Sequence, residues 1–134
     1  MSDTLKGGCN CQHITYVIET ISGKLFNCHC TICQKASASA FIPWAITDIK
    51  YFRWITGEDR IKSFQSSPDF KRNFCPDCGS QLPVIDEKHQ KAYIPAGTID
   101  PPFNKPVDGH WYIRSRPDWH KIGDDAPQHQ TVPE

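Results

Sequence analysis

The sequence predicts a mostly-β domain built of antiparallel sheets, with helical structure limited to short turns. Three observations support this class: short runs rich in β-branched and aromatic residues recur along the chain, turn residues separate them, and a single stretch has a helical composition. The length of 134 residues suits one ordinary domain with its own hydrophobic core. The 11 prolines and 8 glycines fit the many turns that such a domain needs.

The strands are expected where apolar runs lie between turn signals. The first lies within residues 14–20, where Ile14, Tyr16 and Ile18 recur with the two-residue period of a strand. Turn signals such as Gly57 separate the later runs. We expect these further strands at residues 24–28, 41–46, 51–55, 60–64, 70–74, 81–85, 91–95 and 110–115.

The single helical stretch is TICQKASAS at residues 31–39, which is about two turns long. We assign residues 1–122 to one domain and the polar residues 123–134 to an irregular C-terminal tail. The N-terminal segment MSDTLKGGCN lacks the apolar stretch of a targeting signal, and the apolar runs are too short to span a membrane. We therefore expect a cytoplasmic protein that does not act at a membrane.

Charged residues balance in this chain, with 15 Lys and Arg against 15 Asp and Glu. A formal net charge of zero lacks the basic footprint of a nucleic-acid binder, so no nucleic-acid partner is expected. In a reducing compartment the 7 cysteines favour metal binding or catalysis over disulfides. Their odd number also leaves at least one cysteine outside any full set of disulfides. No oligomeric state is predicted.

The cysteines form three groups: Cys9-x-Cys11, Cys28-x-Cys30-x-x-Cys33 and Cys75-x-x-Cys78. Such clustering is typical of metal sites. The segment CPDCG at residues 75–79 is the most specific, because two thiolates on a tight turn can bind one zinc ion. Gly79 permits the positive φ that such a turn often needs. A redox dithiol is the competing interpretation, but that motif normally begins a helix in a βαβ unit, which is not expected here.

Seven ligands divide most naturally into four and three. One division joins Cys30 and Cys33 with the CPDCG pair, like a zinc ribbon, and leaves Cys9, Cys11 and Cys28 for a second site. The other joins Cys9 and Cys11 with the CPDCG pair and leaves the segment CHCTIC at residues 28–33 intact. The second division is favoured because three thiolates on one strand-to-helix turn can meet without a contact between distant segments of the chain. The spacing alone excludes neither division.

Four motifs follow one another along the chain: GGCNCQHITY at 7–16, CHCTICQKAS at 28–37, FCPDCGS at 74–80 and HWYIRSRPDW at 110–119. Together they resemble the glutathione-dependent formaldehyde-activating enzyme family, whose domain is shared with centromere protein V. The resemblance covers roughly residues 5–122. It implies a β-tent fold of stacked antiparallel sheets with short helical turns.

The resemblance also implies two zinc ions per chain. The first would be a closed structural zinc, and the second would have an open fourth position. The implied activity is that of a carbon–sulfur lyase acting on an S-hydroxymethylglutathione-like adduct, with a small thiol such as glutathione and an aldehyde as its partners. The implied ligands are Cys9, Cys11, Cys75 and Cys78 for the structural zinc and Cys28, Cys30 and Cys33 for the second zinc.

An open position on zinc can bind a water or a substrate, polarise a carbonyl or ionise a thiol. Three thiolates make this zinc a weaker Lewis acid than a zinc held by three histidines, which favours positioning of a thiol adduct over activation of water. The alternative is a non-catalytic zinc-binding module for protein interaction on the same fold. A third hypothesis is an enzyme of the same type that uses an unrelated small thiol.

Several other residues are candidates for the surroundings of the open site. His29 should point away from its two cysteine neighbours if the segment is extended, and His110 should cap or pack a strand. Ala38 stands where the family often has Gly, and its methyl group could alter a pocket. The aromatic residues that could wall a pocket or pack in the core are Phe41, Trp44, Trp54 and Trp111. The basic residues that could bind the carboxylates of glutathione are Lys35, Arg53, Arg72, Arg114 and Arg116.

Overall fold

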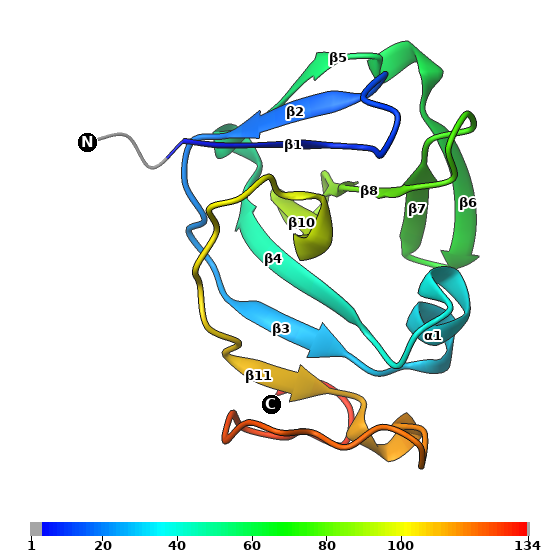
Figure 1. The fold of residues 1–134 in the computed structure, drawn as a ribbon, viewed down its shortest axis with the longest axis vertical. Coiled ribbons are helices and arrows are strands. Elements are labelled where there is room, and N and C mark those ends of the chain that lie inside the picture. The colour runs from blue at the N-terminus through cyan, green and yellow to red at the C-terminus, as the bar shows by residue number, and fades with distance from the viewer. Residues whose placement is uncertain (1–3, 134) are drawn as a thin grey trace.

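Three β-sheets and one short α-helix make up the fold of residues 4–133, which are the residues described by this computed structural model (Figure 1). The predicted mostly-β class is therefore confirmed. The first three residues of the predicted domain and the last residue of the predicted tail lie outside the described residues, and the division at residue 122 stays a prediction. Within residues 4–133, no helix is long and apolar enough to cross a membrane.

The first sheet contains β1 (Leu5–Gly8), β2 (Thr15–Ile18) and β5 (Phe52–Thr56), in the order β1-β2-β5. Both pairs of strands are antiparallel. The predicted alternation in β2 is confirmed, because Tyr16 and Ile18 are buried and their neighbours are half-buried. Strand β1 was not predicted, since its sequence LKGG has two glycines, which favour turns over strands.

The second sheet has five strands in the order β11-β3-β4-β10-β9. Four are joined in antiparallel pairs, but β11 runs parallel to β3, with His110 beside Asn27. The expectation of antiparallel sheets is wrong at this pair. A short hairpin would have made β11 antiparallel to its neighbour, but a long connection brings the chain back to the edge of β3 so that β11 runs in the same direction as β3. The bounds are β3 Leu25–Cys28, β4 Ile42–Asp48, β9 Val84–Asp86, β10 Lys91–Pro95 and β11 Gly109–Trp111.

The third sheet contains β6 (Lys62–Ser67), β7 (Phe70–Phe74) and β8 (Gln81–Leu82), and helix α1 (Thr31–Ser37) joins β3 to β4. Four 3-10 helices complete the described elements. They span Ile49–Tyr51, Glu58–Arg60, Ala96–Thr98 and Ile113–Ser115.

Two predicted strands are shorter than expected. The strand expected at residues 81–85 is divided between β8 and β9 at Pro83, which has no N–H to donate to a neighbouring strand. The strand expected at residues 110–115 ends at Trp111. Tyr112 then takes a left-handed conformation, with φ 59°, and begins a 3-10 turn.

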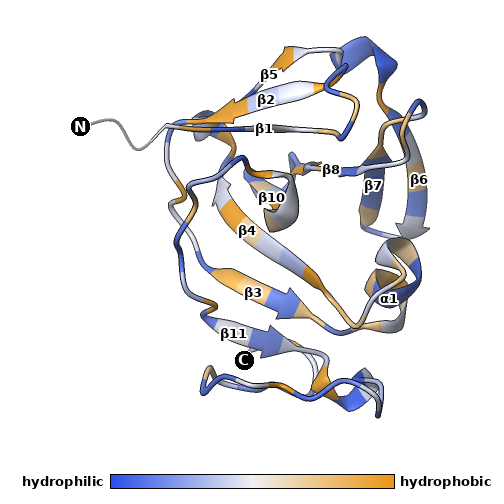
Figure 2. Ribbon diagram, in the orientation of Figure 1, coloured by the Kyte–Doolittle hydropathy of each residue, from blue (hydrophilic) through white to orange (hydrophobic). Residues whose placement is uncertain are grey.

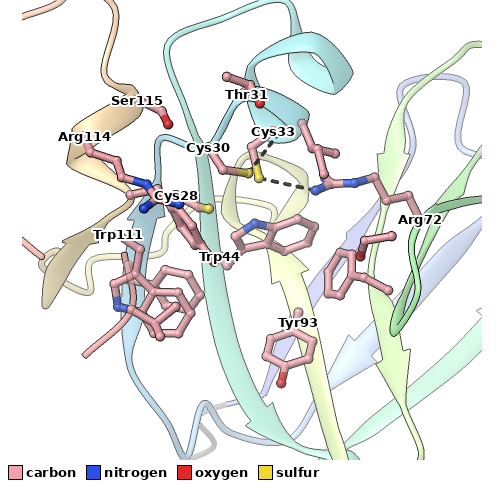
Figure 3. A pocket seen from close by; sticks show the side chains of 16 residues that line it. Cys28, Cys30, Thr31, Cys33, Trp44, Arg72, Tyr93, Trp111, Arg114 and Ser115 are labelled. Atoms are coloured by element: carbon pink, nitrogen blue, oxygen red, sulfur yellow. Dashed lines mark hydrogen bonds between the residues drawn. The ribbon is translucent and has the colours of Figure 1, made fainter. Parts of the chain in front are cut away.

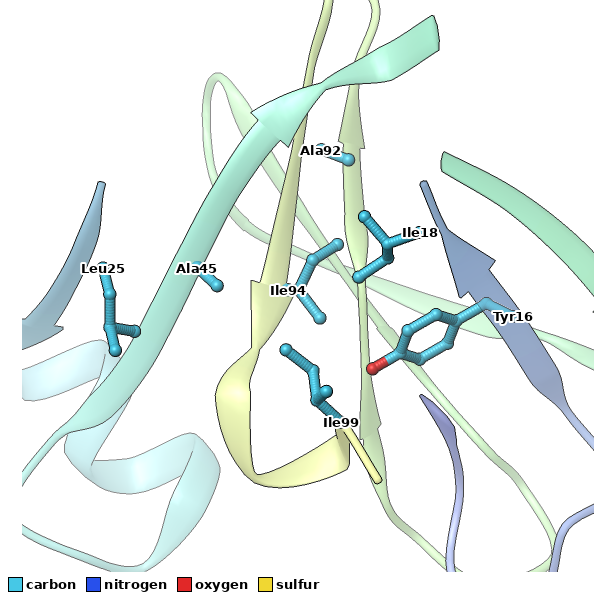
Figure 4. Packing of buried hydrophobic residues seen from close by; sticks show 7 residues of the cluster. All are labelled: Tyr16, Ile18, Leu25, Ala45, Ala92, Ile94 and Ile99. Atoms are coloured by element: carbon cyan, nitrogen blue, oxygen red, sulfur yellow. The ribbon is translucent and has the colours of Figure 1, made fainter. Parts of the chain in front are cut away.

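The main hydrophobic core lies between the first two sheets. Its buried residues are drawn in Figure 4 and are Tyr16, Ile18, Leu25, Ala45, Ala92, Ile94 and Ile99. Apolar residues follow β3 and β4 in Figure 2, whereas β6 and β7 are mainly hydrophilic. The third sheet contributes fewer apolar residues to the interior, among them Leu82 and Phe70.

Residues 123–133 form no strand or helix, but they lie along the free edge of β11 (Figure 1). The His110 N–H donates to the Pro127 carbonyl at 2.8 Å, and the His129 N–H donates to the His110 carbonyl at 2.9 Å. Tyr112 N–H donates to the Thr131 carbonyl at 2.8 Å. This segment is irregular, as expected, yet it supplies backbone partners to the second sheet.

We predict that Gly7→Ala destabilises the fold strongly. A methyl group on Gly7 would lie 2.3 Å from the Tyr16 ring and 2.4 Å from the Thr98 carbonyl oxygen, which is backbone and cannot move aside. Overpacking of this kind costs about 1–3 kcal/mol or more. Gly97→Ala is the matched control, because its methyl group would meet nothing within 4 Å. Urea unfolding should show the loss for the first variant alone, and equal stability of the two variants would contradict the prediction.

Candidate metal centre

Four cysteines from two turns meet at one end of the first and third sheets. The sulfur atoms of Cys9, Cys11, Cys75 and Cys78 all lie within 4.8 Å of one another. The first two follow β1 and the other two follow β7. The Sγ atoms of Cys9 and Cys11 are 3.6 Å apart, and those of Cys11 and Cys75 are 3.8 Å apart.

Each of these turns is closed by its own backbone hydrogen bonds. In the first, the Gln12 N–H donates to the Cys9 carbonyl at 3.1 Å, and Gln12 has a positive φ of 67°. In the second, the Gly79 N–H donates to the Cys75 carbonyl at 2.8 Å. Gly79 has a φ of 78°, so the expected use of glycine here is confirmed.

This group of four is sealed from solvent on one side. Cys9 and Cys75 are fully buried and pack with Ile14 and Leu82. Hydrogen bonds from the Ser80 hydroxyl and backbone lower the pKa of Cys78 to about 5, which favours the thiolate form that a metal needs.

A neighbouring histidine and aspartate are engaged elsewhere. His13 and Asp77 lie near Cys11, but both are exposed. They pair with each other at 3.0 Å, and Asp77 also pairs with Arg60. The sulfur-only set is therefore the better defined ligand group at this position.

The other three cysteines meet where β3 leads into α1. The Sγ atoms of Cys28, Cys30 and Cys33 lie within 4.8 Å of one another. Cys30 is the N-cap of α1 in an extended conformation, and its sulfur accepts from the Cys33 N–H at 3.3 Å. One strand-to-helix turn thus brings all three together without help from distant segments, which is the division that the spacing favoured.

Hydrogen bonds within this triad distribute its protons unevenly. Hydrogen bonds with Cys28 and Cys33 lower the pKa of the Cys30 thiol, and the positive charge of Arg72 lowers it further. Those with Cys30 and Cys33 raise the pKa of Cys28. The three sulfurs are therefore held close enough to share protons, and a bound cation would replace those protons.

His29 points away from the triad, as expected for an extended segment. It is fully buried, and its Nε2 lies 3.1 Å from Nδ1 of His110. Burial, followed by the charges of His110 and His120, lowers the pKa of His29 to about 4. It is therefore neutral at neutral pH and packs behind the triad instead of joining it.

His110 links this histidine to the C-terminal segment. Its Nε2 lies 2.9 Å from a carboxylate oxygen of Asp124. His110 was expected only to cap or pack a strand, and no partner at Asp124 was predicted. The aspartate lies in a segment with no regular hydrophobic pattern, so the sequence contained no sign that it would lie near His110.

A cavity of about 490 Å³ opens beside the triad (Figure 3). Of the four predicted aromatic candidates, Trp44 and Trp111 line it. Phe41 instead packs against His29, with ring centroids 5.1 Å apart, and Trp54 packs against Tyr16 at 6.3 Å. The aromatic residues that line the cavity are Phe26, Trp44, Phe70, Tyr93, Trp111 and Tyr112.

Two of the five predicted basic residues line this cavity, namely Arg72 and Arg114. Arg114 is exposed and lies over the Tyr112 ring at 5.8 Å. Arg72 is only 8% exposed, and its Nη2 donates to Cys33 Sγ at 3.4 Å. Figure 3 shows Arg72 approaching the sulfurs from the side opposite Arg114 in that view. Lys35, Arg53 and Arg116 are not among the lining residues.

Ala38 does not line the cavity but ends α1 in a left-handed conformation with φ 54°. Its N–H donates to the Gln34 carbonyl, as in a helix C-cap. Glycine adopts this conformation more easily than alanine does. The glycine that the family often has at this position is therefore explained by the backbone and not by a pocket.

Both cysteine groups fit zinc. Sulfur-only donor sets select zinc over harder cations, and a tetrahedral zinc with Zn–S bonds of about 2.3 Å separates its sulfurs by roughly 3.8 Å. The measured separations of 3.6 and 3.8 Å in the group of four match that value. All seven cysteines are free, so no disulfide removes a ligand. The group of four could fill a tetrahedron, whereas the triad could supply only three of the four ligands, and the cavity lies beside it.

Comparisons with known proteins agree with this architecture. Among solved structures, a crystal structure of a Rhodobacter sphaeroides protein superposes with a TM-score of 0.63 and 17% sequence identity, covering 92% of this chain and 99% of that chain. This likeness shows the fold alone. None of the curated proteins matches the chain significantly. The model of the family described as "glutathione-dependent formaldehyde-activating enzyme" matches residues 4–115. Because this match spans most of the sequence, the chain belongs to the glutathione-dependent formaldehyde-activating enzyme family.

Proposed function

We propose that this protein is a zinc-dependent carbon–sulfur lyase that acts on the adduct of a small thiol, such as glutathione, with an aldehyde, such as formaldehyde. Family membership supports glutathione-dependent formaldehyde activation. The observation that carries the proposal is the triad of Cys28, Cys30 and Cys33, whose sulfurs converge at the wall of an aromatic cavity while the other four cysteines form a separate group.

The proposal assigns one zinc ion to each group. Cys9, Cys11, Cys75 and Cys78 would hold a structural zinc, since they complete a four-ligand set around a buried turn. The triad would hold the second zinc. The three-sheet arrangement is compatible with the β-tent fold of the family, and the free cysteines suit a reducing cytoplasmic compartment.

When bound at the triad, zinc would supply a Lewis acid that can ionise a thiol or polarise an aldehyde oxygen. The residues of the chain would bind and orient the adduct. The aromatic walls, which include Trp44 and Trp111, would bury the reacting carbon and limit access of water. Arg114 at the cavity would pair with a carboxylate of the thiol.

In the lyase direction, the carbon–sulfur bond of the adduct breaks. The hydroxyl group becomes the carbonyl of the aldehyde, and its proton is transferred in the net reaction to the departing thiolate. In the reverse direction the thiolate adds to the carbonyl carbon, and the oxygen takes up the proton. Atoms and charge balance without any oxidant or reductant.

The alternative is a non-catalytic zinc-binding module for protein interaction on the same fold. An open cavity beside the triad supports catalysis over this alternative, because a purely structural site would gain from a fourth protein ligand. Acceleration of the thiol–aldehyde reaction separates the two hypotheses.

We predict that the purified protein contains two zinc ions per chain. Elemental analysis of Cys28→Ala should find one zinc, because two thiolates remain at the triad while the group of four is intact. Cys75→Ala should lose the other zinc and also unfold at a lower temperature, since Cys75 packs with Ile14 and Leu82. A wild-type count of one zinc that Cys28→Ala leaves unchanged would refute the two-site assignment.

We predict that the protein accelerates exchange between formaldehyde and glutathione. Exchange NMR would follow formaldehyde hydrate and S-hydroxymethylglutathione at equilibrium, with and without protein. Cys33→Ala should reduce the rate to the spontaneous value, because Cys33 is one of three proposed ligands. The control is wild-type protein stripped of zinc by a chelator and then reloaded, which should regain its rate. Equal rates with and without wild-type protein would support another thiol or the interaction module.

We predict that Arg114→Gln raises KM for glutathione roughly three- to tenfold and leaves kcat unchanged. Arg114 is exposed at the cavity, so loss of one charge-assisted contact should weaken binding only moderately. KM for 2-mercaptoethanol, which carries no carboxylate, should not change. The matched control is Arg53→Gln, an exposed arginine on β5 that does not line the cavity. A lower kcat with unchanged KM would contradict the assigned binding role.

A further inference from the structure

Arg72 is a buried cation without a carboxylate partner. Its Nη2 donates to Cys33 Sγ at 3.4 Å, and its Nε donates to the Ser66 hydroxyl at 3.0 Å. Its Nη1 is buried and makes no hydrogen bond. Within residues 4–133, no Asp or Glu forms an ion pair with it. The guanidinium is therefore aimed at the cysteine triad and not at an acidic residue.

Burial of this cation requires a compensating negative charge. A guanidinium stays protonated in proteins, and a buried charge is unfavourable unless an anion or ordered dipoles lie close to it. The rings of Phe70 and Trp44 lie 5.1 and 5.8 Å from the guanidinium carbon and offer partial compensation through their faces. Of the groups that contact the guanidinium, the Cys33 sulfur is the one that can become an anion, so ionised cysteines of the triad would supply the compensating charge.

The charge of the loaded site defines what Arg72 would do there. Three thiolates and one zinc ion sum to a single negative charge, which the guanidinium neutralises. A thiolate entering the fourth position would add a second negative charge, whereas a neutral ligand would add none. A cation fixed against Cys33 therefore favours an anionic fourth ligand over a neutral one.

From these contacts we propose that Arg72 is a positioning residue that acts as the counter-ion of the cysteine triad and selects a thiolate as the fourth ligand. This assignment rests on the proposed function, since it concerns the same open position. Arg72 lies on β7, and Cys75 directly follows the end of that strand. The competing role is purely structural, in which the side chain only fills space between Phe70 and Trp44.

A charge-selective binding experiment separates these roles. Cobalt(II) replaces zinc in the wild type and in the variants Arg72→Lys, Arg72→Gln and Arg72→Met, and visible spectra report binding of a ligand to the open position. Each protein is titrated with 2-mercaptoethanol, which binds as a thiolate, and with imidazole, which binds as a neutral ligand. Arg53→Met serves as the matched control, because Arg53 is exposed on β5.

The expected result is a loss confined to the anionic ligand. Arg72→Met should bind the thiol roughly ten- to a hundredfold more weakly than wild type, the range for loss of a charged hydrogen-bond partner. Its affinity for imidazole should stay within about twofold of wild type. Arg72→Lys keeps the charge and should restore most of the thiol affinity, whereas Arg72→Gln keeps a donor without charge and should not.

Other outcomes overturn the assignment in distinguishable ways. Equal losses for thiol and imidazole would show a structural role, and no loss for either would show that the charge is irrelevant. If Arg72→Met fails to fold, the comparison of Arg72→Lys with Arg72→Gln decides the matter, and equal thiol affinities of these two refute the proposal. If wild-type protein loaded with cobalt binds no thiol at all, the proposed function itself fails and this assignment fails with it.

Discussion

The constraint that joins the first sheet to the third is the convergence of Cys9, Cys11, Cys75 and Cys78. Cys11 and Cys75 are 64 positions apart in the sequence, yet their sulfurs lie 3.8 Å apart. Through them the turn after β1 meets the turn after β7, and a zinc ion held as we propose would fix these two turns to each other. The strands β6 and β7 of the third sheet are mainly hydrophilic, and the sheet reaches the interior chiefly through Phe70 and Leu82. Such a link between the two turns would help to hold β7, which also pairs with β6 and β8 and carries Arg72 to the triad.

The two cysteine groups differ because their local structures differ. The group of four is built from two tight turns, each contributing a pair, which leaves no side of a tetrahedron free. The triad comes from the end of a strand and the first turn of a helix, and the residue between its first two sulfurs points to the opposite side. That alternation of directions along an extended segment turns His29 away from the triad, so a metal held by the three sulfurs would take its fourth ligand from the side of the cavity.

The sequence predicted the cysteine groups well because their members are close together along the chain and their spacing reports a local turn. It also predicted the orientation of His29, which follows from the two-residue period of extended backbone. It failed where long-range packing decides the structure. Strand β1 contains Gly7, which is required by the nearby Tyr16 ring and not by any local preference. The parallel alignment of β11 with β3 and the contact of His110 with Asp124 join segments with no shared pattern.

Burial of Arg72 was equally hidden, since nothing in FKRNF distinguishes a solvated arginine from one that faces a sulfur. Its neighbours Lys71 and Asn73 differ from it in environment because side chains alternate between the two faces of a strand, and Arg72 is the one whose face is buried. Spacing alone left open how the seven cysteines group for the same reason, and the structure places their sulfurs in one group of four and one of three.

The contacts of residues 123–133 with β11 also affect how the protein could be shortened for laboratory work. An uncovered outer strand presents a row of unpaired N–H and C=O groups, which can template association with other chains. Here the carbonyls of Pro127, His129 and Thr131 occupy three N–H groups of β11 and the turn that follows it. A truncation at residue 122 would expose that row and invite self-association through the second sheet, so recombinant versions should retain the C-terminal segment.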